Sequence, residues 1–178
     1  PVRVDRVLAE LQRAWQPAYE AQHRSIQVAG ERGVSVVATD AALSQILGTL
    51  VENSLTHGAG TVRIDARHSG PSVVIEVSDE GSGVRPDLAP FVFDRGQSTK
   101  SSGLGLGLAR ALAEGYGGRL ELARLRPVLF ALFLAAVEAG LKGLETGRSV
   151  VLYTALGPSA DRGGELDAAG GDLVALAP

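Results

Sequence analysis

The strand patterns of this 178-residue chain come in adjacent pairs, and a helical pattern separates each pair from the next. Short β-branched and apolar runs indicate strands, and apolar residues spaced by three and four positions indicate helices. A doubly wound parallel sheet would instead alternate single strands with helices. The order therefore predicts an α/β fold: a two-layer sandwich with a mixed or antiparallel sheet and helices on one face. The expected helices span 4–22, 40–56 and about 103–114, and the expected strands span 25–29, 34–38, 61–67, 72–77, 118–123 and 127–134.

Single residues add local detail to this order. Pro17 lacks a backbone N–H, so it should kink or divide the first helix. The turn-forming residues from Gly30 to Gly33 should join the first two strands as a hairpin. Thr39 or Asp40 should cap the N-terminus of the second helix, because both side chains can accept a hydrogen bond from a free backbone N–H.

Composition limits the classes of function that this chain can have. Hydrophobic residues make up 45% of the chain, which is enough for a packed core. The net charge of −3 argues against a nucleic-acid partner, which requires a basic surface. The chain has no cysteine, so it forms no disulfide and has no thiol nucleophile, which fits a reducing compartment. The longest apolar run, 128–137, is too short to span a bilayer. We expect a cytoplasmic segment without membrane contact, in a parent protein that a membrane segment elsewhere could anchor.

The second expected helix has a polar residue on its apolar face. The row that contains Ile46 and Leu50 leads on to Asn53 and His57. A buried Asn costs free energy unless it is hydrogen-bonded. Asn53 could therefore cap a turn within the core, or it could offer its carbonyl oxygen to a hard cation, and for this residue alone the core role is the more frequent one. His57 could interact with the helix dipole or belong to a site. The apolar face itself consists of Leu43, Ile46, Leu47, Leu50, Val51 and Leu55.

A second group of polar and small residues follows the strand 72–77, where Asp79, Gly81 and Gly83 alternate with other residues. Glycines this close to a carboxylate let the backbone approach a flat ligand. A buried Asp only accepts hydrogen bonds, so it could select the exocyclic amine of adenine. An ordinary glycine-rich turn is the alternative, and for this segment alone it is the more frequent one.

A third group is the polar loop 97–102, which leads into Gly103, Gly105 and Gly107 at the start of a helix. Free N–H groups and the helix dipole make such a start a site for anions, and Arg95 and Lys100 could add positive charge. The spacing matches neither a Walker A loop nor a Rossmann fingerprint. Close helix packing is the alternative explanation for these glycines. The leucines at 104, 106 and 108 are expected in the core.

These segments occur together and in order, and together they resemble the catalytic domain of bacterial sensor histidine kinases, from the superfamily that includes DNA gyrase. LSQILGTLVENSLTHG resembles the N box, and VSDEGSGV resembles the G1 box. FVFDRGQST resembles the F box and the start of the ATP lid, and SSGLGLGLARALAEGYGGRLEL resembles the G2 box. The resemblance covers about residues 2–134.

The resemblance implies a Bergerat-type fold with ATP and Mg²⁺ as cofactors. Asn53 would coordinate Mg²⁺, Asp79 would bind the adenine amine, and Arg95 and Lys100 would reach the phosphates. The implied catalytic residues are Asn53 and Lys100. The implied nucleotide-binding residues are Asn53, His57, Asp79, Gly81, Gly83, Phe93, Arg95, Lys100, Gly103, Leu104, Gly105, Leu106 and Gly107. Phe93 would anchor the lid, or it could simply be a core aromatic residue.

The resemblance also implies partners: a histidine-bearing dimerisation domain of the parent kinase that receives the γ-phosphate, and a response regulator downstream. No phosphoacceptor motif surrounds His23, His57 or His68, so we do not expect the chain to autophosphorylate alone. Thr49 stands where the family commonly has a polar Asn or Glu, which argues against efficient ATP hydrolysis. An anti-sigma-type serine kinase and a non-catalytic nucleotide-binding scaffold remain alternatives.

Residues 135–178 lie beyond the resemblance, and we expect them to form a C-terminal extension of unknown role, separate from a catalytic domain at 1–134. Their pattern predicts a helix at 135–145, a strand at 149–155, a loop rich in Gly and Asp at 157–171 and a short strand at 172–177.

Overall fold

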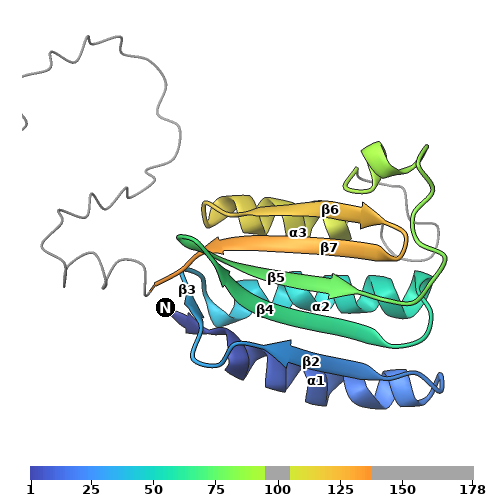
Figure 1. Ribbon diagram of the computed structural model, residues 1–178, viewed down its shortest axis with the longest axis horizontal. Coiled ribbons are helices and arrows are strands. Elements are labelled where there is room, and N and C mark those ends of the chain that lie inside the picture. The colour runs from blue at the N-terminus through green and yellow to red at the C-terminus, as the bar shows by residue number, and fades with distance from the viewer. Residues whose placement is uncertain (95–104, 138–178) are drawn as a thin grey trace, which may run out of the picture.

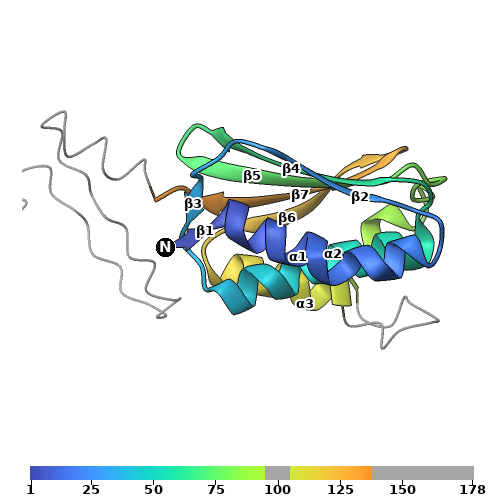
Figure 2. The same ribbon diagram turned by 90° about the horizontal axis from the view of Figure 1, so that it is seen from below.

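The computed structural model describes residues 1–94 and 105–137, which form two layers. One layer is a five-stranded sheet, and the other consists of helices that all cover the same face of that sheet (Figures 1 and 2). This arrangement confirms the predicted α/β sandwich. The elements are β1 (Val2–Arg3), α1 (Val4–Glu20), β2 (Ile26–Gly30), β3 (Ser35–Val36), α2 (Asp40–His57), β4 (Val62–Ser69), β5 (Ser72–Ser78), η1 (Ala89–Phe91), α3 (Gly105–Gly115), β6 (Arg119–Leu125) and β7 (Val128–Ala135).

The sheet is mixed, with the strand order β2-β4-β5-β7-β6. β2 pairs parallel with β4, and α2 lies between these two strands in the chain. The other neighbours pair antiparallel, so that Ile75 of β5 stands between Ala66 of β4 and Leu132 of β7. Gly70, with a φ of +59°, turns the chain between β4 and β5.

The predicted hairpin between the first two strands is wrong. β3 pairs with β1 in a separate two-stranded sheet, whereas β2 joins the main sheet beside β4. The backbone of Gly30, with a φ of +114°, lies directly against the backbone of Ala66, and the N–H of Glu31 donates to the Ala66 carbonyl at 2.8 Å. The chain therefore leaves the edge of the sheet at Gly30. The apolar pattern of the two runs indicates strands but does not specify their partners.

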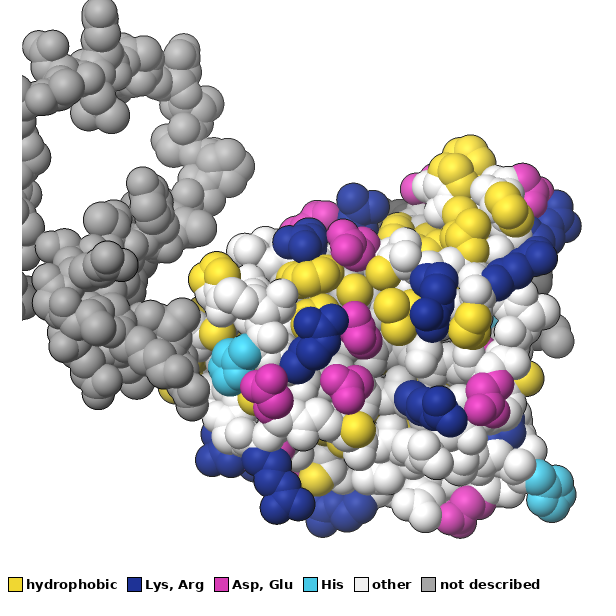
Figure 3. All heavy atoms as spheres, in the orientation of Figure 1, with side chains coloured by type: hydrophobic (Ala, Val, Ile, Leu, Met, Phe, Trp, Pro, Cys, Tyr) yellow, Lys and Arg dark blue, Asp and Glu magenta, His cyan; other side chains and the backbone are white. Residues whose placement is uncertain are grey.

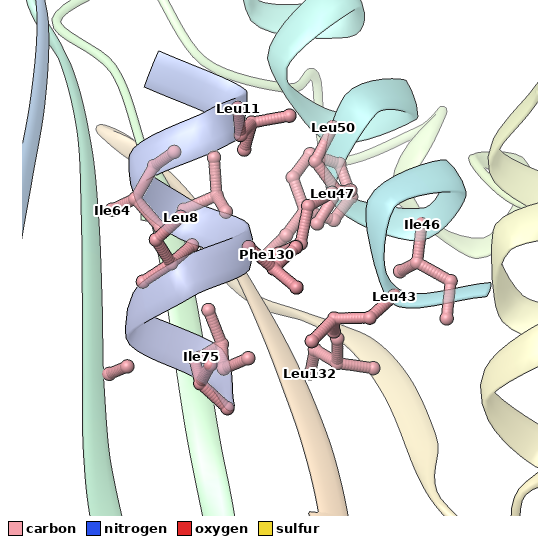
Figure 4. Close-up of a cluster of buried hydrophobic side chains, with 14 of the residues drawn as sticks. Leu8, Leu11, Leu43, Ile46, Leu47, Leu50, Ile64, Ile75, Phe130 and Leu132 are labelled. Carbon is pink, nitrogen blue, oxygen red and sulfur yellow. The ribbon is translucent and has the colours of Figure 1, made fainter. Parts of the chain in front are cut away.

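The core fills the space between the sheet and the helices. Figure 4 shows Leu8 and Leu11 of α1 beside residues of α2 and beside side chains of the strands. The predicted apolar face of α2 is buried, although Leu55 is only partly so. Burial of a side chain of this size contributes about 1.5–3 kcal/mol, so this face fixes α2 against the sheet. The α2 residues labelled in the figure are Leu43, Ile46, Leu47 and Leu50.

Pro17 does not divide the first helix, because α1 continues through it to Glu20. Only one intrahelical hydrogen bond is lost at a proline near a helix end. Tyr19 holds the last turn in place: it is fully buried, and its hydroxyl donates to the carbonyl oxygen of Val51 at 2.7 Å. The predicted cap of α2 is confirmed, since the Thr39 hydroxyl accepts from the N–H of Ala42 at 3.2 Å.

The end of the described chain lies beside its beginning (Figure 1). β7 runs to Ala135, Ala136 pairs with Val36, and the N–H of Val137 donates to Ser35 at 3.0 Å. The helix predicted from residue 135 is therefore wrong at 135–137, and the predictions for 138–178 lie outside the described residues. The division of the chain after residue 134 stays a prediction.

Charges of both signs alternate on the outer face of the sheet, which faces the viewer in Figure 3. Arg67 of β4 pairs with Glu76 of β5 at 3.0 Å, and Arg63 pairs with Glu80 at 3.7 Å. In the described part of the chain, no helix is both long and apolar enough to cross a lipid bilayer.

Candidate functional site

A cavity of about 380 Å³ opens between the C-terminal half of α2, the loop after β5, the region of η1 and the first turn of α3. It brings together segments that are far apart in the sequence. The lining residues are Thr49, Glu52, Asn53, Thr56, His57, Ser82, Gly83, Val84, Arg85, Leu88, Phe91, Val92, Asp94, Gly105, Leu106 and Gly107.

Asn53 is half-buried, and it lines this cavity from α2. Its amide makes no hydrogen bond with any residue that the structure describes, so Asn53 does not cap a turn of the described core. No described residue therefore competes with a ligand or a cation for the side-chain oxygen. His57 and Glu52 are exposed on the same wall.

Thr49 lies one helical turn before Asn53, and it is 8% exposed. Its hydroxyl donates to the carbonyl oxygen of Gln45 at 2.9 Å, a bond within the same helix. Its methyl carbon lies near the first residue of α3, where a Cβ on Gly105 would stand 3.2 Å away. Thr49 therefore packs α2 against α3, and its hydroxyl proton is already engaged.

Asp79 follows β5 and is 6% exposed. One carboxylate oxygen accepts from the N–H of Gly81 at 2.7 Å. The Cα of Gly58 packs against this carboxylate so closely that a Cβ there would lie 2.5 Å from the Asp79 Cγ. Neither Asp79 nor Gly81 lines the cavity, which reaches this loop only at Ser82 and Gly83.

Gly83 lines the cavity and has a φ of +79°, a conformation that favours glycine. A Cβ here would overlap the carbonyl oxygen of Leu125, and the next N–H, that of Val84, donates to this same oxygen at 2.9 Å. Glycine at this position therefore lets the loop after β5 dock on the turn between β6 and β7.

Phe93 lies outside the cavity lining and packs into the core. Its ring meets that of Phe130 edge to face, with 6.1 Å between centroids, and the guanidinium of Arg110 lies 5.2 Å from its centroid. Phe91 lines the cavity instead and is 49% exposed. A Cβ on Gly107 would stand 2.7 Å from the Phe93 carbonyl oxygen, so the first turn of α3 passes close to this segment.

The predicted site residues Arg95, Lys100, Gly103 and Leu104 lie outside the described residues. Leu106 lines the cavity and is only partly buried. Leu108 was expected in the core but is 50% exposed. Residues two apart on a helix point in nearly opposite directions, so the alternating leucines cannot share one face. Ala109 and Ala113 are the fully buried residues of α3.

Both signs of charge reach the cavity, with carboxylates at Glu52 and Asp94 and a guanidinium at Arg85. Arg85 is bound to Asp87 at 3.0 Å, and this hydrogen bond lowers the pKa of the Asp87 carboxyl. Within the described ranges 1–94 and 105–137, no group of three His, Asp or Glu side chains could hold a metal ion. A cation here would therefore need ligands in addition to the described His, Asp and Glu side chains.

Sequence reasoning missed one cavity residue of α2 and most of those in the irregular segments opposite it. The missed lining residues are Thr56, Ser82, Val84, Arg85, Leu88 and Asp94. Thr56 could have been found by its spacing of three from Asn53, which puts both on one helix face. The remaining five lie in irregular segments, where no periodicity shows which side chains face inward.

The fold is that of solved histidine kinase structures. A structure described as full-length ShkA in complex with AMPPNP covers 76% of this chain and 30% of its own, with 27% identity and a TM-score of 0.68. A nucleotide-free catalytic domain of the histidine kinase ThkA covers 75% of this chain and 94% of its own, with a TM-score of 0.68. At 20% identity, this second likeness concerns the fold alone.

Residues 38–154 match the family of histidine kinase-, DNA gyrase B- and HSP90-like ATPases, and the chain belongs to this family. The histidine kinase AfsQ2 of Streptomyces coelicolor is 36% identical over 115 residues, which are 61% of this chain and 20% of that protein. The sensor kinase CarS of Pseudomonas aeruginosa is 37% identical over 84 residues, which are 45% and 19% of the two chains. The chain thus spans about a fifth of the length of these curated relatives. The predicted family membership is confirmed.

Proposed function

We propose that this domain binds Mg-ATP in the cavity between α2 and α3 and transfers the γ-phosphate to a histidine on a separate dimerisation domain. The observation that carries this proposal is Asn53, whose side chain faces the cavity without a hydrogen-bond partner among the described residues. Opposite it, Gly105, Leu106 and Gly107 begin α3. The first N–H groups of a helix have no partner within it, and the helix dipole favours an anion there. We therefore expect the phosphates of ATP to bind at the cavity wall formed by the first turn of α3.

The residues also fit Mg²⁺. This ion commonly takes one or two side-chain oxygens and completes its shell with phosphate oxygens and water. Asn53 would supply one oxygen, and Glu52 lies beside it on the same cavity wall. When bound, the ion would neutralise charge on the phosphates. The lack of a larger acidic cluster in the described ranges is consistent with a site that is completed by nucleotide.

The hydrogen bond made by Thr49 favours transfer of the phosphate to a histidine over hydrolysis of ATP. A general base must be free to accept a proton from water, and the Thr49 hydroxyl is neither basic nor free, since it donates to Gln45. His57 lines the cavity, whereas His68 lies on the sheet, where its Nδ1 is 2.6 Å from a carboxylate oxygen of Glu31. No phosphoacceptor motif surrounds these two histidines or His23, so we propose an acceptor histidine outside this chain, with a response regulator as the next partner.

Asp79 would recognise the adenine amine. One of its oxygens is engaged by Gly81, and the other has no hydrogen-bond partner among the described residues. This role requires the base to reach past Ser82 and Gly83 toward the end of β5, beyond the present lining of the cavity.

The test is a calorimetric titration of the chain with a non-hydrolysable ATP analogue, with and without Mg²⁺, beside the GTP analogue. Saturable binding that Mg²⁺ strengthens and that prefers adenine supports the proposal. Transfer of phosphate from ATP to a histidine-bearing dimerisation domain of the parent kinase then tests the reaction. Absence of any binding would contradict the proposal and favour the scaffold alternative.

A further inference from the structure

Arg24 hydrogen-bonds to two backbone segments that border the site. Its Nη1 donates to the carbonyl oxygens of Ser54 and Leu55, each at 3.0 Å. Its Nε donates to the carbonyl oxygen of Gly60 at 2.9 Å. The first two oxygens belong to the last turn of α2, and the third belongs to the loop 58–60 that follows. One half-buried side chain therefore joins the end of α2 to this loop.

The last carbonyl groups of a helix carry the negative end of the dipole. The Ser54 carbonyl oxygen also accepts from the N–H of Gly58 at 2.8 Å, so Arg24 is a second donor to it. A cation at this position is stabilising. Arg24 forms no ion pair with a carboxylate in the described part of the chain, so its charge is directed at the end of α2. The helix that ends here also carries Asn53 and His57.

The loop 58–60 in turn contacts the segment that contains Asp79. The carbonyl oxygen of Ala59 accepts from the N–H of Glu80 at 3.0 Å. The carboxylate of Glu80 accepts from the N–H of Thr61 at 2.9 Å. Gly58 packs on the Asp79 carboxylate, as described above. A shift of this loop would therefore move Asp79 relative to α2.

The end of α1 fixes Arg24 itself. The backbone N–H of Arg24 donates to the carbonyl oxygen of Tyr19 at 2.9 Å, and His23 has a φ of +55° between them. The guanidinium lies 5.1 Å from the centroid of the Tyr19 ring, whose hydroxyl is bonded to Val51. Burial raises the pKa of Tyr19, so this hydroxyl stays protonated and keeps donating. α1 and α2 lie side by side under the sheet (Figure 2).

We infer that Arg24 is a positioning residue for base recognition: it holds the loop 58–60 and the last turn of α2 so that Asp79 and Asn53 keep a fixed separation. This inference rests on the proposed function. Arg24 does not line the cavity, so it would act through the backbone and without contact to the nucleotide. Its loss should therefore change selectivity as well as affinity.

The test compares Arg24→Ala and Arg24→Lys with Leu11→Ala, a variant in the buried part of α1 that leaves the bonds of Arg24 intact. Each is titrated with the ATP and GTP analogues under conditions where urea denaturation shows it to be folded. Arg24→Ala should weaken binding of the ATP analogue about tenfold, the effect of one or two lost hydrogen bonds. The ratio of ATP to GTP affinity should fall as well.

Arg24→Lys keeps the charge but cannot reach all three carbonyl oxygens, so it should not restore the ratio. Leu11→Ala should keep the ratio of the unmodified chain. An unchanged ratio in Arg24→Ala, or full restoration by lysine, would overturn the inference.

Amide hydrogen exchange without nucleotide separates this inference from the proposed function. Arg24→Ala should speed exchange at Gly58, Thr61, Glu80 and Gly81 more than Leu11→Ala does. A uniform increase across the domain would overturn the positioning role, whatever the chain binds. If the unmodified chain binds no nucleotide, the proposed function fails, and the positioning role of Arg24 in base recognition fails with it. Selective exchange would then still identify the link between the loop and Asp79.

Discussion

Gly83 and Gly33 offer a matched pair for testing how the loop after β5 is held. Both have a φ of +79°. A Cβ on Gly33 would meet no atom within 4 Å, whereas a Cβ on Gly83 would overlap the Leu125 carbonyl oxygen and stand 2.7 Å from Cγ of Arg126. Substitution by alanine therefore imposes the same backbone strain at both sites and adds a steric conflict at Gly83 only.

The expected losses of stability follow from the backbone strain and from the steric conflict. A non-glycine residue in the left-handed region costs roughly 1–2 kcal/mol, so Gly33→Ala should lower the free energy of unfolding by about that much. Forcing extra atoms into a packed contact typically costs about 1–3 kcal/mol more. The N–H of Val84 also donates to the Leu125 oxygen, so this bond must shift as well. We expect Gly83→Ala to be less stable than Gly33→Ala by about 2 kcal/mol.

Urea denaturation of the two variants measures this difference. With a slope of about 2 kcal/mol/M, the midpoints should differ by roughly 1 M. Gly83 also lines the cavity, so Gly83→Ala should weaken binding of the ATP analogue, whereas Gly33→Ala should not. Equal midpoints would refute the reasoning, because they would mean that the turn between β6 and β7 yields to the new methyl group at no cost.

Three further changes test the site and the end of the domain. Asp79→Asn keeps the shape of the side chain but replaces an acceptor oxygen by a donor, so calorimetry should show a loss of the preference for ATP over GTP; a preserved preference would exclude this role. Asn53→Ala should remove the Mg²⁺ dependence of nucleotide binding, and Ser44→Ala, at an exposed position of the same helix, should not; equal Mg²⁺ stimulation in all three chains would count against Asn53 as a ligand. Deletion of 138–178 should leave affinity for the ATP analogue nearly unchanged. A cut after residue 134 should also lower the thermal midpoint, because Ala136 is 8% exposed and pairs with Val36; equal midpoints for the two truncations would argue against that contribution.

The sequence was sufficient for elements whose residues repeat with a regular period. The apolar face of α2 and its cap at Thr39 were predictable because both depend on neighbours within one helix. The partner of β2 was not predictable, because the parallel pairing with β4 is decided by contacts across more than thirty residues of chain. That α1 continues through Pro17 was not predictable either, because the burial of Tyr19, which offsets the local loss of one hydrogen bond, depends on packing against α2.

The site was predictable where a polar residue interrupts an apolar pattern, as at Asn53. It was not predictable where irregular backbone supplies the wall, as at Arg85 and Leu88. Arg24 gave no signal at all, because its partners at Ser54 and Gly60 lie thirty or more positions away. The contacts of Arg24 can be recognised only once α1 and α2 are packed side by side.

Contacts within the protein can explain why glycine stands at several positions of the G1 and G2 boxes. A Cβ at Gly81 would lie 2.8 Å from the Asp79 carboxylate, and one at Gly107 would lie 2.7 Å from the Phe93 carbonyl. Gly83 likewise faces Leu125. Packing therefore requires glycine at these positions even if no ligand binds, so the glycine pattern by itself does not establish a nucleotide site. Asn53 is different, because no described residue satisfies its amide. No described residue competes with a ligand for this half-buried amide on the cavity wall, which makes Asn53 the residue on which the functional proposal depends.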